Sequence, residues 1–137
     1  MLDQYKKLLL QNDKYRIRLS EFSGDAGNGM YDQSFNGHEL NNIRFTTKDS
    51  DNDGTGGNCA NYWSSGWWFN ACMCANLNGK NHNNGIAPSW GGILWYTNDW
   101  STDRKRSLKT VTMAIRPRIG KYTCINTLIA TFILSQL

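Results

Sequence analysis

Apolar and polar positions along the first twenty residues predict a short helix followed by a strand. Four apolar side chains recur at helical spacing near the start, at Leu2, Tyr5, Leu8 and Leu9. They predict a short helix over residues 2–11. The period then becomes two, because Tyr15, Ile17 and Leu19 alternate with arginine and serine. This alternation predicts a half-buried strand over 15–19.

Beyond residue 20 the apolar runs are short and are interrupted by glycine and asparagine. We expect strands over 43–47, 92–96 and 111–116. The last one alternates its apolar residues Val111, Met113 and Ile115 inward and stops at Pro117. Residues 76–79 are expected to form a turn and residues 81–85 a polar loop. The pattern predicts a loop-rich α+β chain with few short strands and short helices.

The end of the chain has a different character, since residues 124–134 are apolar and rich in β-branched side chains. This run is shorter than the ~20 residues that a membrane span needs, and it contains Asn126, Thr127 and Thr131. A membrane anchor is therefore less favoured than an added strand, a buried or disordered end, or a spurious extension of the reading frame. We treat residues 118–137 as an apolar tail of unknown role.

Length and charge narrow the class of protein. The 137 residues suffice for one domain with a single modest core. Fifteen Lys and Arg against eleven Asp and Glu give a net charge of +4, without the clustered basic stripe of a nucleic-acid-binding protein. We expect the basic run 104–106 to be solvated surface. Six Trp and thirteen Gly indicate tight turns held by aromatic anchors.

Four cysteines are compatible with disulfides or with a metal site: Cys59, Cys72, Cys74 and Cys124. A single residue lies between Cys72 and Cys74, whereas about two to four residues usually lie between two cysteine ligands of zinc. His38 and His82 are isolated from that pair. Disulfides are therefore favoured over zinc, and they imply an oxidising compartment. No signal peptide is recognised near Met1, so either the start of the protein is missing or the chain is not exported. The cysteines favour a missing start.

The acidic stretch 49–54 places three aspartates on alternate positions ahead of a glycine. Asp49, Asp51 and Asp53 match the first half of an EF-hand loop. The second half fails, because Ala60 stands where a bidentate glutamate is required. Carboxylates this close repel one another unless a cation lies among them, and Ca²⁺ binds hard oxygens on irregular loops. On the residues alone, a calcium site and a solvated acidic turn both remain open.

A series of short blocks then occurs in a fixed order: Phe45–Asp49, Asp51–Asp53, Gly57–Ala60, Gly66–Cys72, Leu77–Gly79, Gly92–Trp95, Ser107–Lys109 and Ile115–Pro117. In this order they resemble the fibrinogen C-terminal domain, which ficolins, tachylectins, angiopoietins, tenascins and the fibrinogen chains carry. The resemblance covers about residues 14–117 and only the second half of that domain. It implies that residues 1–13 lie outside the partial domain, and that the chain is a fragment, a shortened isoform or a partial gene model.

The resemblance implies a calcium site in the acidic loop. Ca²⁺ would be held by the side chains of Asp51 and Asp53 and by the backbone carbonyls of Thr55 and Gly57, completed by water. Asp49 lies just outside this set and would act through water. We expect an affinity of about 10⁻⁴–10⁻³ M, as in other extracellular modules.

The resemblance also implies a disulfide between Cys59 and Cys72 that fixes the exit of the loop. Such a bridge would contribute on the order of 3 kcal/mol through the unfolded state. In the family the peptide bond before the second cysteine is often cis, so we expect a cis bond between Ala71 and Cys72. The ligand pocket of the family lies beside this bond.

By the same resemblance, that pocket would be lined by Tyr62, Trp63, Met73 and Trp90. In acetyl-recognising members such as ficolins and tachylectins, the residue after the second cysteine is typically histidine. Met73 stands there instead, and its thioether packs against a methyl group without donating a hydrogen bond. Residues 67–68 are expected in the core, whereas for Trp63 and Trp90 the core and the pocket both remain open.

Two functions follow from the resemblance. The first is a secreted, calcium-binding, lectin-like module that binds acetylated or glycan ligands in innate-immune pattern recognition. The second is a protein-interaction module that docks a receptor or a matrix protein, as in angiopoietin or tenascin relatives, without binding sugar. Both imply an extracellular location, while nucleic acid and membrane are not expected partners. The sequence carries no collagen-like or coiled-coil segment from which an oligomeric state is readable.

An enzyme is not expected. The Cys residues that the resemblance pairs are committed to a disulfide, and no Ser or Cys has a plausibly paired His. No carboxylate pair outside the acidic loop has a clear acid–base arrangement.

Overall fold

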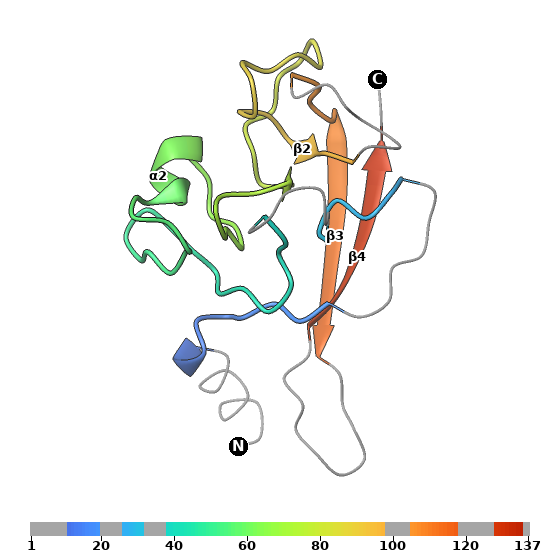
Figure 1. Ribbon diagram of the computed structural model, residues 1–137. Helices are drawn as coiled ribbons and strands as arrows, with labels where there is room; N and C mark the ends of the chain where they lie inside the picture. Colours follow the sequence, from blue (N-terminus) through green and yellow to red (C-terminus); the bar gives the residue numbers. More distant parts are fainter. Residues whose placement is uncertain (1–10, 20–25, 32–37, 98–104, 118–127, 136–137) are drawn as a thin grey trace.

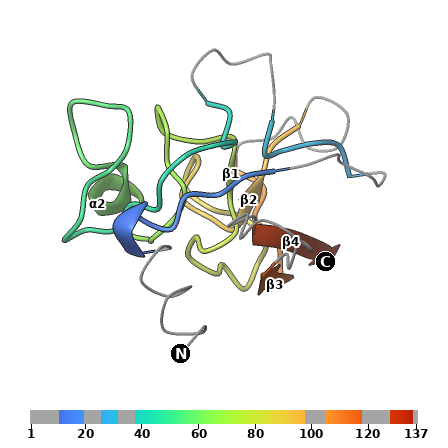
Figure 2. The ribbon, with the colours of Figure 1, turned by 90° about the horizontal axis from the view of Figure 1, so that it is seen from below.

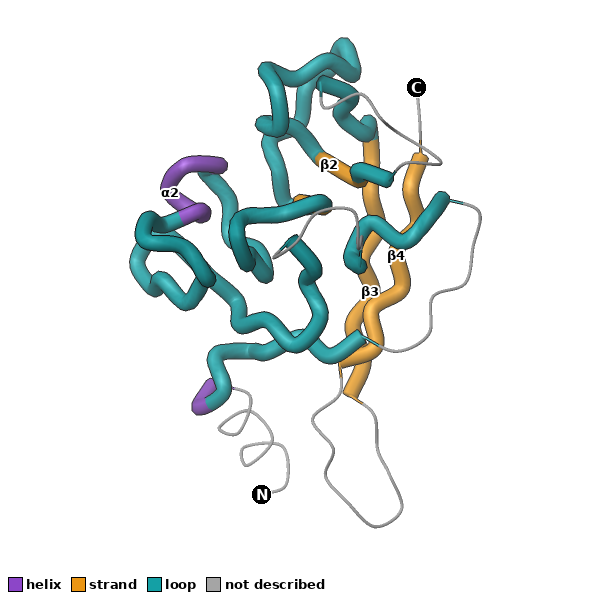
Figure 3. Tube along the Cα trace, in the orientation of Figure 1, coloured by secondary structure: helices purple, strands orange, loops and turns teal. Residues whose placement is uncertain are grey.

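The computed structural model describes residues 11–19, 26–31, 38–97, 105–117 and 128–135 (Figure 1). The elements within them are α2 (Cys59–Trp63), β1 (Ala75–Asn76), β2 (Leu94–Trp95), β3 (Thr110–Pro117) and β4 (Leu128–Ser135). Loops connect these short elements and make up most of the described chain (Figure 3). The predicted loop-rich α+β class is confirmed.

The strands form two separate antiparallel pairs. β1 pairs with β2 through Ala75↔Trp95 and Asn76↔Leu94. β3 pairs with β4 along its whole length, from Thr110↔Ser135 to Pro117↔Leu128. Of the alternatives for the apolar tail, residues 128–135 therefore form an added strand. The β3–β4 pair lies on one side of the molecule and α2 on the opposite side (Figures 1 and 2).

Large aromatic side chains from loops and from β2 lie in the core. Trp67, Phe69 and Trp95 are buried, and Trp67 packs edge-to-face against Trp68 with ring centroids 5.2 Å apart. Leu40, Leu77, Leu94 and Leu108 fill the space around them. Trp67 and Trp68 thus lie in the core as expected, because a chain with few strands must bury its apolar area through large rings.

The predicted strand over 15–19 is wrong. Lys14 and Tyr15 have positive φ angles of 53° and 51°, so the chain turns there instead of extending. Tyr15 is 42% exposed, contrary to the inward position that the alternation gave it. The alternation holds only further on, where Ile17 is buried and Arg18 exposed. Ile17 N–H donates to the Ile43 carbonyl at 2.9 Å, but no strand is assigned to this segment.

The predicted strand over 43–47 is also wrong. It is reduced to two isolated bridges, Thr46↔Trp67 and Thr47↔Ser50. Thr46 exchanges both backbone hydrogen bonds with Trp67, at 2.9 and 3.1 Å. At Thr47 the chain folds back on Ser50 and enters the acidic loop, so the pairing cannot propagate.

The predictions of strands, turn and loop in the later part of the chain agree with the structure. β2 falls within 92–96, and β3 covers the predicted strand and ends at Pro117. A backbone hydrogen bond from Gly79 N–H to the Asn76 carbonyl closes the predicted turn at 3.2 Å, and residues 81–85 form a loop. The predicted helix over 2–11 lies outside the described residues except for residue 11, which is helical. The described part of the chain contains no helix with the length and apolar character to cross a membrane.

Candidate calcium site and the adjoining surface

The acidic loop begins with a tight turn that Asp49 stabilises. Thr47 and Ser50 exchange backbone hydrogen bonds at 3.0 and 3.2 Å. The Thr47 hydroxyl donates to Asp49 Oδ1 at 2.7 Å, and this hydrogen bond lowers the pKa of the Asp49 carboxyl. The Asp49 carboxylate therefore accepts a hydrogen bond at the entrance of the loop. This agrees with its expected place outside the calcium ligands.

Asn52 attaches the loop to the body of the protein. Its side-chain amide donates to the carbonyls of Phe45 at 2.9 Å and Ser50 at 3.1 Å. Its backbone N–H donates to the Thr46 hydroxyl at 3.1 Å. The Asn52 side chain thus points toward the body of the protein, and the two flanking aspartates lie nearer to solvent. Asp51 is exposed and Asp53 is half-buried.

Asp53 is the centre of the loop's hydrogen bonds. Its Oδ1 accepts from the backbone N–H and the hydroxyl of Thr55, both at 2.9 Å. Its Oδ2 accepts from the backbone N–H of Cys59 at 2.8 Å. Asp51 Oδ1 accepts from the Asp53 N–H at 3.2 Å, and Thr55 Oγ1 contacts the Gly57 carbonyl. Oxygen atoms of Asp53, Thr55 and Gly57 therefore lie in contact, and Asp51 joins them through the Asp53 N–H. We call these oxygen atoms the oxygen cluster. Thr55 contributes its hydroxyl to these contacts, whereas its backbone carbonyl was the expected calcium ligand.

Glycines determine where this loop is held and where it is open. A Cβ atom on Gly54 would lie 2.6 Å from Asn70 Oδ1, so the loop approaches Asn70 closely at that point. The Gly54 N–H donates to the Asn70 carbonyl at 3.1 Å. A Cβ on Gly56 or Gly57 would meet nothing within 4 Å. The loop is therefore fixed at its base and open around its oxygen cluster.

The donor set fits calcium. Two carboxylates, a hydroxyl and backbone carbonyls are hard oxygen ligands, and Ca²⁺ accepts such mixed sets with irregular geometry. In the described residues, three or more His, Cys, Asp or Glu side chains nowhere come together as a metal-binding group. A site here would therefore rely on carbonyl oxygens and water beside its two aspartates, which suits calcium and does not suit zinc.

The loop leads directly into α2, which is held at both ends. Asn58 caps the helix, because its side-chain oxygen accepts from the Asn61 N–H at 2.9 Å. The C-cap of the helix is Ser64, which adopts a left-handed conformation with φ 55°.

The predicted Cys59–Cys72 disulfide is confirmed, with 5.8 Å between the Cα atoms, and the predicted cis bond precedes Cys72. Cys74 is buried, and the position of Cys124 lies outside the described residues.

The four predicted ligand-binding residues differ in their exposure. Tyr62, on α2, is 77% exposed and stacks edge-to-face on Trp63 with ring centroids 4.7 Å apart. Trp63 and Trp90 are half-buried against the core, and Trp90 contacts Tyr96. Met73 is only 2% exposed and belongs to the core. The described contacts therefore present Tyr62 as the exposed aromatic residue beside the acidic loop.

Besides Asn52, two further residues that position the site were missed by sequence reasoning. Asn70 holds the base of the loop, and its own N–H donates to the Cys72 carbonyl at 2.8 Å. Asn58 ties the exit of the loop to its entrance, because its side-chain amide donates to the Thr47 carbonyl at 3.1 Å. An asparagine directly before a short apolar segment is an N-cap signal that would have found Asn58. No comparable local signal marks Asn70.

Comparison with known proteins places these features in a family. The family described as fibrinogen beta and gamma chains, C-terminal globular domain, matches residues 2–118. Human fibroleukin is 38% identical over 123 residues, which are 83% of this chain and 27% of that protein. Rat fibrinogen-like protein 1 is 39% identical over 124 residues, 83% of this chain and 38% of that protein. The chain thus spans well under half the length of these relatives.

Solved structures agree with the sequence match. The fibrinogen-like globe domain of human ANGPTL2 superposes with a TM-score of 0.60 at 35% identity, covering 72% of this chain and 42% of that one. Lamprey fibrin D-dimer, complexed with the peptide Gly-His-Arg-Pro-amide, gives a TM-score of 0.62 at 34% identity, covering 72% of this chain and 34% of that one. The chain belongs to the family of the fibrinogen C-terminal globular domain.

Proposed function

We propose that this chain is a calcium-stabilised recognition module of an extracellular protein, and that it binds a peptide or protein ligand at the surface around α2. The observation that carries the proposal is the double role of Asp53. One carboxylate oxygen belongs to the oxygen cluster of the loop, and the other accepts from the Cys59 N–H at the start of α2. A cation bound by the loop would therefore also fix the helix that presents Tyr62.

An extracellular setting is supported by the cysteine chemistry and the relatives. A disulfide persists in oxidising compartments, and Cys59 and Cys72 are bridged. The matched relatives are fibrinogen-like proteins. The proposed module acts by binding and not by catalysis.

A peptide or protein is favoured over an acetylated sugar as the ligand. The lamprey relative is complexed with a tetrapeptide amide, which supports a peptide-binding surface in this fold. Met73 is buried and offers a thioether where acetyl-recognising relatives typically have histidine, so the imidazole donor is missing.

A glycan ligand is the second candidate, and one observation favours it. The Tyr62 ring is 77% exposed and is backed by Trp63, and an exposed ring of this kind offers a flat apolar face to a sugar. Binding of N-acetylglucosamine without binding of peptide would favour this candidate over the first.

Calorimetry on the full chain tests the metal first. Wild type should bind calcium with a Kd of about 10⁻⁴–10⁻³ M. Asp53→Asn should abolish this binding, whereas Asp49→Asn, which removes the same charge outside the proposed ligands, should keep it. The absence of heat with millimolar calcium would refute the calcium site.

The ligand is tested with Gly-His-Arg-Pro-amide and with N-acetylglucosamine, each in calcium and in EDTA. We expect peptide binding in calcium, its loss in EDTA, and a weakening of about tenfold or more in Tyr62→Ala, since an exposed aromatic anchor typically dominates such contacts. Tyr31→Ala removes another exposed tyrosine outside α2 and should leave binding unchanged. Equal binding by wild type and Tyr62→Ala would exclude the α2 surface.

A further inference from the structure

Three arginines from two segments of the chain gather around one aspartate. Arg16 Nε lies 3.0 Å from Asp13 Oδ2, while Arg18 Nη2 and Arg44 Nε approach the same carboxylate at 3.9 Å. We call Arg16, Arg18 and Arg44 the arginine cluster. With three positive charges and one negative charge, the group keeps two net positive charges.

The backbone beneath the cluster is anchored to the core. The indole N–H of Trp68, a buried residue, donates to the Tyr15 carbonyl at 2.7 Å. The Phe45 N–H donates to the Lys14 carbonyl at 2.9 Å, which joins the two segments that carry the arginines. Lys14 and Tyr15 both adopt left-handed backbone conformations, which are uncommon for residues other than glycine. The turn that brings Asp13 back toward the arginines is thus held in place from inside the protein.

The three arginines differ in how strongly the protein engages them. Arg16 donates to both Asp13 oxygens and, through Nη1, to the Asn42 carbonyl at 2.7 Å. Arg18 and Arg44 reach Asp13 only at 3.9 Å, and their side chains are 48% and 51% exposed. A guanidinium has five N–H donors, and with exposures of 48% and 51% these two side chains have donors left for solvent or a ligand. Arg16 therefore positions the group, while Arg18 and Arg44 are available to a ligand.

Asp13 remains charged and keeps the cluster together. The hydrogen bond from Arg16 lowers the pKa of the Asp13 carboxyl most; burial opposes it, and the charges of Arg16, Arg44 and Arg18 add further lowering, so the net shift is downward. A carboxylate that is ionised at neutral pH between the arginines reduces their mutual repulsion. The two outer guanidinium groups are thereby held side by side without being neutralised.

We propose that the arginine cluster binds the sulfate groups of a sulfated polysaccharide. Planar guanidinium groups donate paired hydrogen bonds to tetrahedral oxyanions, and they are less strongly hydrated than ammonium groups. Exposed Lys14 and Tyr15 border the cluster and extend the surface along which a chain with repeated charges would lie. The choice of sulfate over the phosphate of lipid or nucleic acid rests on the extracellular setting of the proposed function.

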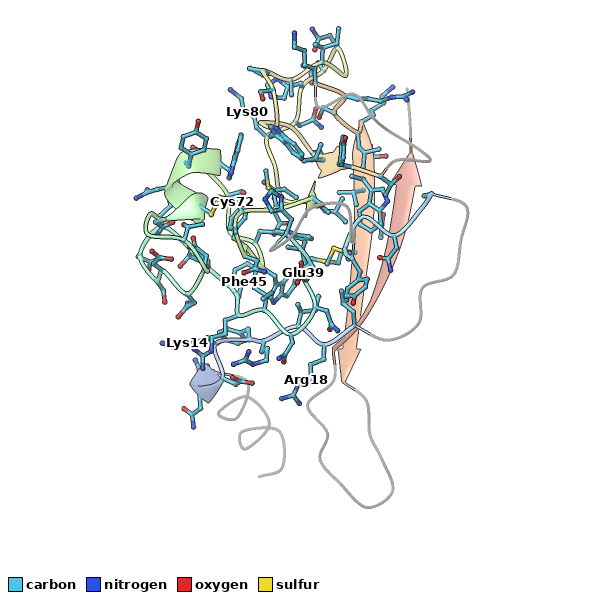
Figure 4. All side chains as sticks on the ribbon, in the orientation of Figure 1. Lys14, Arg18, Glu39, Phe45, Cys72 and Lys80 are labelled. Carbon is cyan, nitrogen blue, oxygen red and sulfur yellow. A yellow bond between two sulfur atoms is a disulfide. The ribbon has the colours of Figure 1, made fainter. Side chains whose placement is uncertain are left out.

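This surface is separate from the one around α2. Figure 4 shows Lys14 and Arg18 at one end of the molecule, whereas Cys72, whose disulfide partner begins α2, lies well away from them. Asn52 of the acidic loop contacts the backbone of Phe45, next to Arg44, but none of the described hydrogen bonds or ion pairs joins the side chains of the arginine cluster to that loop. Polysaccharide binding should therefore occur without calcium, in contrast to the proposed ligand binding at α2.

Fluorescence anisotropy of a labelled heparin oligosaccharide with the full chain tests the proposal, at about physiological salt and in EDTA. Arg18→Gln/Arg44→Gln should weaken binding by on the order of tenfold or more, because each lost contact is a hydrogen bond to a charged group. It should also make the dependence of affinity on salt concentration shallower, since fewer ions are released on binding. Lys80→Gln/Lys109→Gln removes two exposed positive charges elsewhere and should bind nearly as wild type does.

Three further measurements decide the outcome. Arg18→Lys/Arg44→Lys keeps the charge and should give an intermediate affinity, because paired hydrogen bonds are lost. Desulfated heparin should not bind. Asp53→Asn should bind heparin as wild type does, so failure of the calcium site would not be mistaken for failure of this one. Equal losses in the arginine and lysine double variants, no binding by wild type, or preferential binding to phosphatidylserine vesicles would each overturn the proposal.

Discussion

Replacing Asp53 with alanine separates the two roles assigned to its carboxylate. Without calcium, the change leaves the N–H of Cys59 without its acceptor, and Cys59 is a buried residue at the start of α2. A buried donor left unpaired destabilises a protein by about 1–3 kcal/mol. We therefore expect the free energy of unfolding in EDTA to fall by that amount.

In the presence of calcium, Asp53→Ala should also lack the stabilisation that calcium binding gives to wild type. A ligand that binds only the folded state stabilises it by RT ln(1 + [L]/Kd). With a Kd of about 10⁻⁴–10⁻³ M and calcium at about 10 mM, wild type should gain about 1.4–2.7 kcal/mol. Asp53→Ala should not gain it, so the difference from wild type should be larger in calcium than in EDTA.

Asp51→Ala is the matched control for the hydrogen-bonding role. Asp51 is exposed and accepts only from the Asp53 N–H at 3.2 Å among the contacts described. In EDTA its removal should change stability by no more than about 0.5 kcal/mol, as for most surface substitutions. In calcium it should lose the same increment as Asp53→Ala, because it removes the other carboxylate ligand.

Urea unfolding followed by tryptophan fluorescence measures all three proteins in EDTA, in calcium and in magnesium at the same ionic strength. Equal stability of Asp51→Ala and Asp53→Ala in EDTA would refute the link from Asp53 to α2. A full calcium increment in both variants would refute the assignment of the ligands. An equal increment in magnesium would show that the loop does not select calcium over magnesium.

Three other perturbations have defined outcomes. Replacing Cys59 and Cys72 by alanine should lower the free energy of unfolding by about 3 kcal/mol, because the bridge spans a sequence separation of 13; an unchanged urea midpoint would contradict this. Gly79→Ala should prevent cooperative folding, because its methyl group would overlap a neighbouring backbone carbonyl, whereas Gly56→Ala meets nothing within 4 Å; equal thermal unfolding of the two would be inconsistent with the structure. Asp13→Asn should be less stable than wild type by up to about 1 kcal/mol at neutral pH. Since the pKa of Asp13 is lowered in the folded state, its contribution is present above the ordinary Asp pKa and disappears as the pH falls through the folded-state value, so acid unfolding curves of the two proteins should converge.

The alternating pattern located β3 and misplaced the strand at 15–19, and the physical difference is pairing. β3 has a full-length partner in β4, so its backbone groups are satisfied along the strand. The Ile17 N–H has a backbone partner in the Ile43 carbonyl. The turn at Lys14 and Tyr15 comes directly before this segment, so the extended backbone cannot continue toward the N-terminus. Side-chain periodicity reports burial on one face, and it carries no information on whether a neighbouring strand is present.

The candidate calcium site was visible in the sequence because its ligands are close together in the chain. The cysteine pairing came only from the family resemblance, since spacing leaves several pairings open. The arginine cluster could not be predicted from the sequence. The alternating pattern places Arg16 and Arg18 on the polar face of a strand, and Arg44 comes from a distant segment of the chain. Contacts made by folding over long sequence separations leave no local signature.

A helix of five residues cannot persist by its own propensity. The orientation of α2 is instead imposed from outside, by a covalent link at its first residue and by the Asn58 cap. Its outward side chains, Asn61 and Tyr62, are exposed and make no contact with these two anchors among the contacts described. Substitutions at these two positions leave the disulfide and the cap in place, so this short segment is a natural place to install a new binding specificity on an unchanged frame.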